Sequence, residues 1–129
     1  MPDDTHRASS MVAEGRFEAA LALMRQRPQP LGGEFGVGER LLLMELLERT
    51  GNLTQARAQA AVLTKHPKLT AVGRVRCLLV DGLVSKQLGH LEKSASTFLQ
   101  AYRMSERLDT SEIRAWCHLR YLGVSADLH

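Results

Sequence analysis

The residues that could carry covalent or metal chemistry do not come together at a useful spacing in this chain of 129 residues. Cys117 and His118 are adjacent, as a thiol nucleophile and its base could be. Adjacent residues of a helix point about 100° apart, so these two side chains do not converge on one atom. Cys77 and Cys117 each lie in an apolar stretch, which favours buried free thiols and a reducing compartment. The sequence therefore predicts no catalytic residue, no metal site and no cofactor.

Charge is a clearer signal than reactive chemistry. From residue 49 to residue 80 the chain has six basic residues and no Asp or Glu. Such a stretch raises the local positive potential and steers acidic partners toward it. Nucleic acid is disfavoured as the partner, because the stretch has no aromatic residue and the whole chain has a net charge of only +3. The basic residues are Arg49, Arg57, Lys65, Lys68, Arg74 and Arg76.

The elements that must position these side chains are helices. Leu and Ala dominate the apolar residues while Val and Ile are sparse, which favours an all-α fold. Apolar residues at helical spacing, separated by Gly and Pro, predict helices over residues 3–14, 16–27, 37–50, 53–66, 70–88, 91–108 and 111–127. Asn52 with Gln55, and Asp109 with Glu112, have the spacing of capping boxes at the starts of two helices.

One short motif occurs three times. Gly15, Gly51 and Gly89 lie at intervals of 36 and 38 residues, and each is followed by an apolar residue two positions later and a small residue five positions later. A motif that returns at such intervals, with helix-forming sequence between its copies, predicts a stacked helical repeat. We expect Gly51 and Gly89 at equivalent turns. We also expect burial between helices of the small residues Ala20, Ala56 and Ser94.

These motifs resemble the tetratricopeptide repeat (TPR). The matching segments are Gly15-x-Phe17-x-x-Ala20 with Pro28, Gly51-x-Leu53-x-x-Ala56 with Pro67, and Gly89-x-Leu91-x-x-Ser94 with Phe98 and Ala101. The chain departs from the family in its longer intervals and in Met44, which stands where the family has Gly. The resemblance implies stacked antiparallel helical hairpins, about three units plus a C-terminal helix, in a single domain over residues 1–129.

The resemblance also implies a binding site, because the first helix of each unit lines the concave face of such an array. Counting back from the turn glycines places Glu45, Glu48 and Arg49 on this face in the second unit. In the third unit it places Arg76, Leu79, Leu83 and Lys86 there, with Arg120 in a partial fourth unit. The basic members would form a track for an acidic peptide or a C-terminal carboxylate; the alternative is solvated charges without a partner. The expected partner-binding residues are Glu45, Arg49, Arg76, Lys86 and Arg120.

Two functions fit these observations. The first is a non-enzymatic module that binds a peptide or protein segment in its concave groove. The second is the sensory or regulatory arm of a larger bacterial transcription regulator. Residues 1–4 do not resemble a secretory signal and no apolar run is long enough to span a membrane, so we expect a cytoplasmic protein without membrane contact. The sequence leaves the partner and the oligomeric state open.

Overall fold

The computed structural model describes residues 4–26 and 36–108, and in these ranges the chain is helical without a strand. The helices end within three residues of the predicted bounds. The predicted helix over residues 111–127, the cap at Asp109 and Glu112, and the segment from Pro28 to Gly33 lie outside the described residues. The observed helices are α1 (Asp4–Ala13), α2 (Phe17–Gln26), α3 (Val37–Arg49), α4 (Leu53–Thr64), α5 (Ala71–Gln87) and α6 (Leu91–Ser105).

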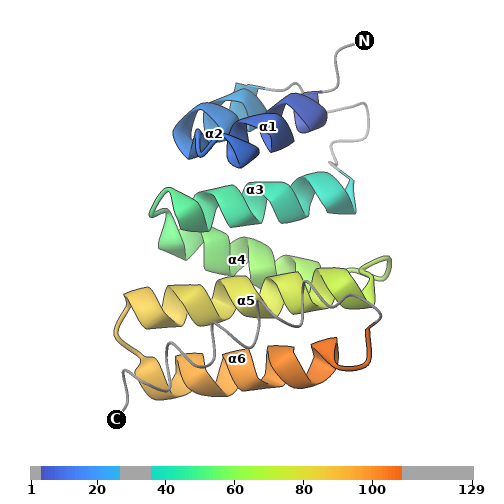
Figure 1. Ribbon diagram of the computed structural model, residues 1–129, viewed down its shortest axis with the longest axis vertical. Helices are drawn as coiled ribbons and strands as arrows, with labels where there is room; N and C mark the ends of the chain where they lie inside the picture. Colours follow the sequence, from blue (N-terminus) through green and yellow to red (C-terminus); the bar gives the residue numbers. More distant parts are fainter. Residues whose placement is uncertain (1–3, 27–35, 109–129) are drawn as a thin grey trace.

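The helices form three antiparallel hairpins stacked in one direction (Figure 1). The pairs are α1 with α2, α3 with α4, and α5 with α6, and the partners in each pair pack along one another. Successive hairpins are joined by contacts of α2 with α3, and of α5 with both α3 and α4. The stack therefore has the predicted all-α architecture of repeated hairpins.

Glycine closes each hairpin at the same point. Gly15, Gly51 and Gly89 have φ angles of 78°, 83° and 83°, the left-handed conformation that glycine adopts without a Cβ penalty. We call each of these three turns a glycine joint. In each joint the residue after the glycine donates its N–H to the carbonyl five residues earlier, as in a Schellman motif. The prediction of equivalent turns is confirmed. The three bonds run from Arg16 to Met11, Asn52 to Leu47 and His90 to Ser85, each 2.8 Å long.

The predicted capping box at Asn52 is wrong. The side chain of Asn52 caps no N–H of α4 and instead donates from Nδ2 to Oγ1 of Thr50 at 2.8 Å. A capping box also requires a free N–H on the cap residue, but the N–H of Asn52 already donates to Leu47 in the glycine joint. Gln55 therefore makes no capping bond to Asn52, and its Oε1 accepts from Arg25 at 2.9 Å. A side-chain cap occurs instead at α5, where Oγ1 of Thr70 accepts from the N–H of Gly73 at 3.0 Å.

The small residues after each turn lie in the core. Ala20, Ala56 and Ser94 are all fully buried, which confirms the prediction. Ser94 also bonds across its hairpin, since its Oγ donates to the carbonyl of Gly82 in α5 at 2.7 Å. A small side chain at this position lets the two helices of a hairpin approach closely.

Candidate functional site: a cavity between the hairpins

A cavity of about 340 Å³ opens where the first hairpin meets α3 and α5. Its lining is mostly apolar, and the polar residues in it belong to α3. Such a concave, apolar space with a few polar groups is typical of a ligand site. The lining residues are Val12, Phe17, Leu42, Glu45, Leu46, Glu48, Arg49, Val80 and Leu83.

The spacing of residues along α3 explains why this helix supplies most of the lining. Leu42, Glu45, Leu46 and Arg49 recur at intervals of three and four, so they share one face of the helix. Leu41, Met44 and Leu47 lie on the other side and are buried in the core. The helix is therefore anchored by one apolar face and presents a mixed face to the cavity.

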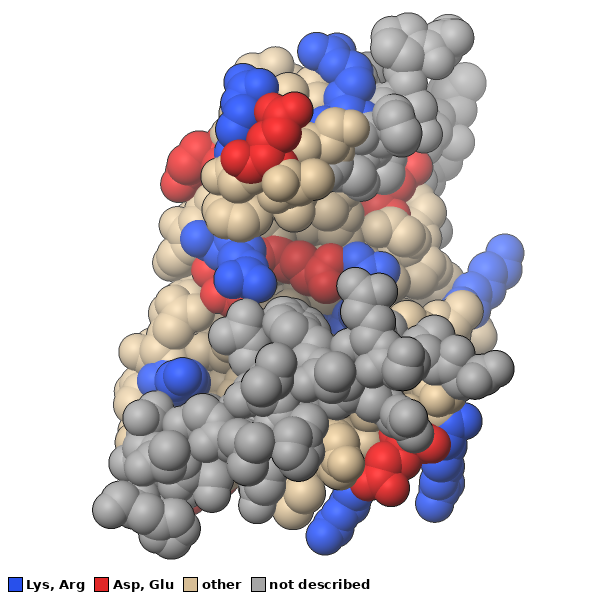
Figure 2. All heavy atoms as spheres, viewed as in Figure 1, with Lys and Arg blue, Asp and Glu red and all other residues tan. Residues whose placement is uncertain are grey.

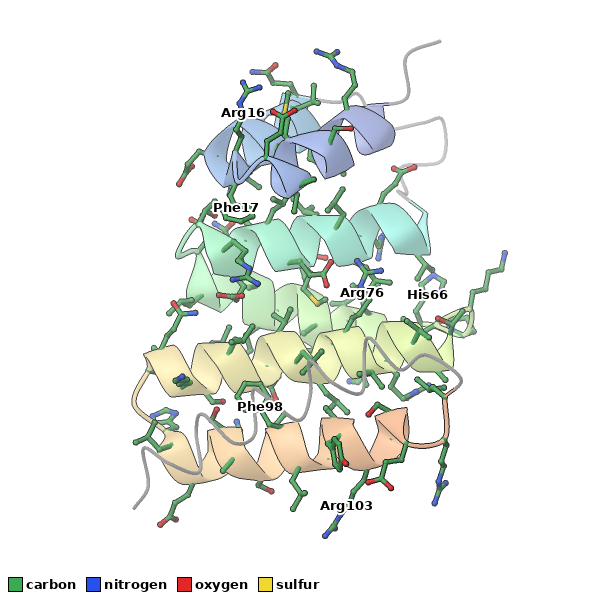
Figure 3. The ribbon with its side chains drawn as sticks, in the orientation of Figure 1. Arg16, Phe17, His66, Arg76, Phe98 and Arg103 are labelled. Atoms are coloured by element: carbon green, nitrogen blue, oxygen red, sulfur yellow. The ribbon has the colours of Figure 1, made fainter. Side chains whose placement is uncertain are left out.

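Glu45 and Arg76 form a bidentate ion pair that joins α3 to α5. Nε of Arg76 donates to Oε2 of Glu45 at 3.0 Å, and the Nη2 group of Arg76 donates to Oε1. Burial lowers the pKa of the Arg76 guanidinium, but the hydrogen bonds and charge of Glu45 outweigh this effect and hold it above its ordinary value. Arg76 is therefore already engaged by a carboxylate of the same chain (Figure 3).

Glu48 makes a second link between the same two helices. The residue is only 6% exposed, and its Oε2 accepts from Nε2 of Gln87 at 2.8 Å. The other oxygen, Oε1, lies 3.9 Å from Nε of Arg49, which is an ion-pair distance but too long for a hydrogen bond. Glu48 therefore faces Arg49 loosely while Gln87 holds it in place.

Arg49 is the most accessible of these charged groups. Its side chain is 41% exposed, and its guanidinium carbon lies 5.8 Å from the centroid of the Phe17 ring. This is within the range of a cation–π contact. Figure 3 shows Phe17 at the start of α2, pointing toward α3. Among the described residues Arg49 has no hydrogen-bond partner, so its guanidinium donors are available at the mouth of the cavity.

The structure thus brings together only part of the predicted site. Glu45 and Arg49 line the cavity from α3, and Arg76 of α5 pairs with Glu45, so acidic and basic side chains form a mixed band across this face (Figure 2). Lys86 does not line the cavity, and Arg120 lies outside the described residues. Leu79 is buried in the cluster around Phe98, so it does not offer an open groove surface, whereas Leu83 does line the cavity.

Two side chains that contact the charged residues of the candidate site were not predicted from the sequence. Phe17 was predicted only as an apolar residue at a turn, and Gln87 was not singled out. Their roles depend on contacts with residues about 30 or more positions away, such as Arg49 and Glu48. One signal was present, because Phe17 is the only aromatic residue at its position in the three repeated motifs.

The acid-free stretch does not form one basic patch. Arg57 turns toward the opposite side of α5, where its Nη2 donates to Oγ of Ser85 at 2.9 Å and its Nε lies 3.4 Å from Asp81. Cys77 is nearby and buried, and burial raises the pKa of its thiol, with partial opposition from a hydrogen bond to Thr64. A raised pKa reduces the thiolate fraction, so Cys77 is poorly suited to nucleophilic chemistry.

No protein-family model, curated protein or solved structure matches this chain. Its function must therefore be inferred from the side chains themselves. Within residues 4–26 and 36–108, no three His, Cys, Asp or Glu side chains are grouped as metal ligands would be. None of the helices in these ranges combines the length and the apolar character needed to cross a bilayer. Cys117 and His118 lie outside the described residues.

Proposed function

We propose that this protein is a non-enzymatic interaction module that binds a segment of another protein in the cavity between α1, α2, α3 and α5. One observation carries the proposal: Arg49 has uncommitted guanidinium donors beside an apolar cavity of about 340 Å³. A mostly apolar pocket with a few well-placed polar groups favours binding of a side chain and orientation of its backbone. Of the three charged residues that line this one, Glu45 is paired with Arg76 and Glu48 accepts from Gln87. Because Arg76 is already paired with Glu45, Arg49 is the arginine that remains available to a bound segment.

The bound segment, in this proposal, carries an apolar side chain next to a carboxylate. The apolar side chain would contact Phe17, Leu46 and Val80, and the carboxylate would bind the planar fork of Arg49. Stacking of Arg49 on Phe17 keeps the guanidinium oriented and limits the conformational entropy lost on binding. The carboxylate would belong to an acidic side chain or to the C-terminus of the partner.

The resemblance to TPR proteins is part of the same proposal. Support comes from the matched glycine joints and from the buried small residue that follows each of them. Binding on the face of the first helices is what that resemblance implies. The alternative, a regulatory arm of a larger bacterial transcription regulator, would use the same cavity and stays a prediction, as does a cytoplasmic location.

A peptide selection tests the proposal. Random peptides with free C-termini are selected on the immobilised full chain, and the enriched sequences are measured by fluorescence anisotropy. We expect apolar residues next to Asp, Glu or the C-terminus, and a loss of affinity of about tenfold in Arg49→Glu, because a charge-assisted pair becomes a repulsion. Phe17→Ala should weaken the same peptides.

Arg74→Glu is the matched control, since it makes the same charge change at an exposed residue of α5 that does not line the cavity. If the selected peptides lack acidic groups, or if both variants lose affinity equally, the cavity is not the binding site. Arg76→Glu would be a poor substitute, because it places a second carboxylate against Glu45 and disturbs the packing of α3 on α5.

A further inference from the structure

A second surface lies far from the cavity, on the outer face of α6. Four polar or basic side chains recur there at intervals of three and four and are exposed: Lys93, Ser96, Gln100 and Arg103. Arg107 continues the line beyond the helix end. Figure 3 shows Arg103 pointing away from α5 at the end of the stack.

This face carries more basic than acidic side chains. The acidic residues of α6 and its C-terminal turn are Glu92 and Glu106, and Glu106 lies three residues after Arg103, a spacing at which side chains are neighbours. Neither Arg103 nor Arg107 has an ion pair or hydrogen bond with any described side chain. Arg103 lies in the last turn of α6, where the helix dipole favours a cation, whereas Lys93 lies in the first turn, where the dipole disfavours one. The dipole uses the charge of Arg103 but leaves its guanidinium donors for a ligand.

The face also has an apolar floor. Leu99 and Met104 are half-buried and lie with Ser96, Gln100, Arg103 and Arg107 around a surface cavity of about 330 Å³. None of the six lining residues is acidic or aromatic. Binding of single-stranded nucleic acid relies on aromatic stacking, which this surface does not offer. An apolar floor between two guanidinium groups suits instead a segment with an apolar side chain flanked by carboxylates.

Comparison of the hairpins indicates that this face stays open when another unit follows. The 38-residue interval between Gly51 and Gly89 places residues 96, 99, 100 and 103 of α6 opposite residues 58, 61, 62 and 65 of α4. These four α4 residues are exposed even though α5 packs on α4, and Val62 is 55% exposed. Ser96, Leu99, Gln100 and Arg103 of α6 are therefore on the outside of the array, whereas Met104 and Arg107 correspond to the half-buried residues His66 and Leu69.

We propose that the outer face of α6 docks an acidic amphipathic segment of a partner protein. Carboxylates of the segment bind Arg103 and Arg107, and an apolar side chain between them contacts Leu99 and Met104. Ser96 and Gln100 supply hydrogen bonds to the backbone of the segment. This site shares no residue with the cavity beside Arg49, so either binding site can exist without the other.

The probe is a labelled synthetic helix with Glu at positions four apart and Leu between them, measured by fluorescence anisotropy with the full chain. A matched peptide carries Lys in place of Glu. We expect the acidic peptide to bind, the basic peptide not to bind, and the affinity to fall as salt rises. The double variant Arg103→Glu/Arg107→Glu should weaken binding by about tenfold or more, because two charge-assisted contacts are replaced by repulsion.

Lys65→Glu/Arg74→Glu is the control, with the same change in net charge at exposed residues of α4 and α5, and should change the Kd by less than about twofold. Arg103→Gln/Arg107→Gln removes the two charges without adding acids. It replaces Arg103→Glu/Arg107→Glu in the test if circular dichroism shows that the Glu variant has lost helicity. Equal losses in control and test variants overturn the proposal. So does tighter binding, through the same two arginines, of a single-stranded oligonucleotide or of vesicles with anionic lipid. Binding to the acidic peptide that survives Arg49→Glu separates this site from the cavity.

Discussion

The ring of Phe98 in α6 lies directly against the backbone of Gly82 in α5. A Cβ added at Gly82 would lie 2.5 Å from Cε1 of Phe98 and 2.7 Å from its Cδ1, closer than carbon atoms can approach. A glycine inside a helix costs about 1 kcal/mol relative to alanine. That cost is tolerated here because it lets an aromatic ring fill the space between the two helices of the hairpin.

The other two hairpins also have one small and one large residue at the positions equivalent to Gly82 and Phe98. Seven residues before and nine residues after each turn glycine, one residue is small and the other large. All six are buried. The large residue is on the second helix in the first and third hairpins, and on the first helix in the second. The pairs are Ala8 with Met24, Met44 with Ala60, and Gly82 with Phe98.

Gly82→Ala should destabilise the protein by about 1–3 kcal/mol, because the new methyl group overlaps the ring of Phe98, which is fully buried. The free energy of unfolding from urea titration measures this. Gly38→Ala is the control, since a Cβ there meets nothing within 4 Å and should leave stability unchanged or raise it by up to about 1 kcal/mol. In a Phe98→Leu background the Gly82→Ala cost should shrink, and strictly additive effects would contradict the contact.

Ala56→Leu should also cost about 1–3 kcal/mol, because Ala56 is fully buried between helices and the added carbons overfill the core. Ala58→Leu makes the same chemical change two residues later on the exposed side of α4 and should shift stability by less than about 0.5 kcal/mol. Equal urea midpoints for the two variants would show that position 56 does not set the helix spacing.

The ion pair between Glu45 and Arg76 should have a measurable coupling energy. A double-mutant cycle with Glu45→Gln and Arg76→Met isolates it, and we expect about 1 kcal/mol because the pair is bidentate and half-buried. The coupling should decrease with added salt, since both side chains retain partial contact with solvent. A coupling of zero would mean that this pair does not stabilise the packing of α5 on α3, which would then depend on apolar contacts and the bond between Gln87 and Glu48.

Cys77 should make stability fall at alkaline pH. Burial raises the pKa of its thiol in the folded state, so the folded chain holds this proton more tightly than the unfolded chain. The stabilisation is complete below the unfolded pKa of about 8.5 and is lost as pH rises from there through the folded pKa. The free energy of unfolding from urea titration should therefore differ more between about pH 7 and pH 10 in Cys117→Ala than in Cys117→Ala/Cys77→Ala. Identical pH dependence in the two would contradict this.

The fold was predictable because its determinants are local in sequence. Apolar periodicity placed the helices, and Gly51 and Gly89 marked the joints through a backbone conformation that other residues avoid. The cap at Asn52 was mispredicted because its N–H is taken by Leu47, which spacing alone does not reveal. The charges of the site were hardest to predict, since Glu45 meets Arg76 31 positions away and the pairing changes Arg76 from a free cation into a structural contact.

The glycine joints have a consequence for how such a chain can change over generations. Each joint completes its hydrogen bonds within the residues that immediately surround its glycine, as from Asn52 to Leu47 and from His90 to Ser85. No joint borrows these bonds from a neighbouring hairpin. A duplication or deletion of one whole hairpin in the gene would therefore leave the hydrogen bonds of every remaining joint intact. A single genetic event can thus lengthen or shorten the stack of hairpins.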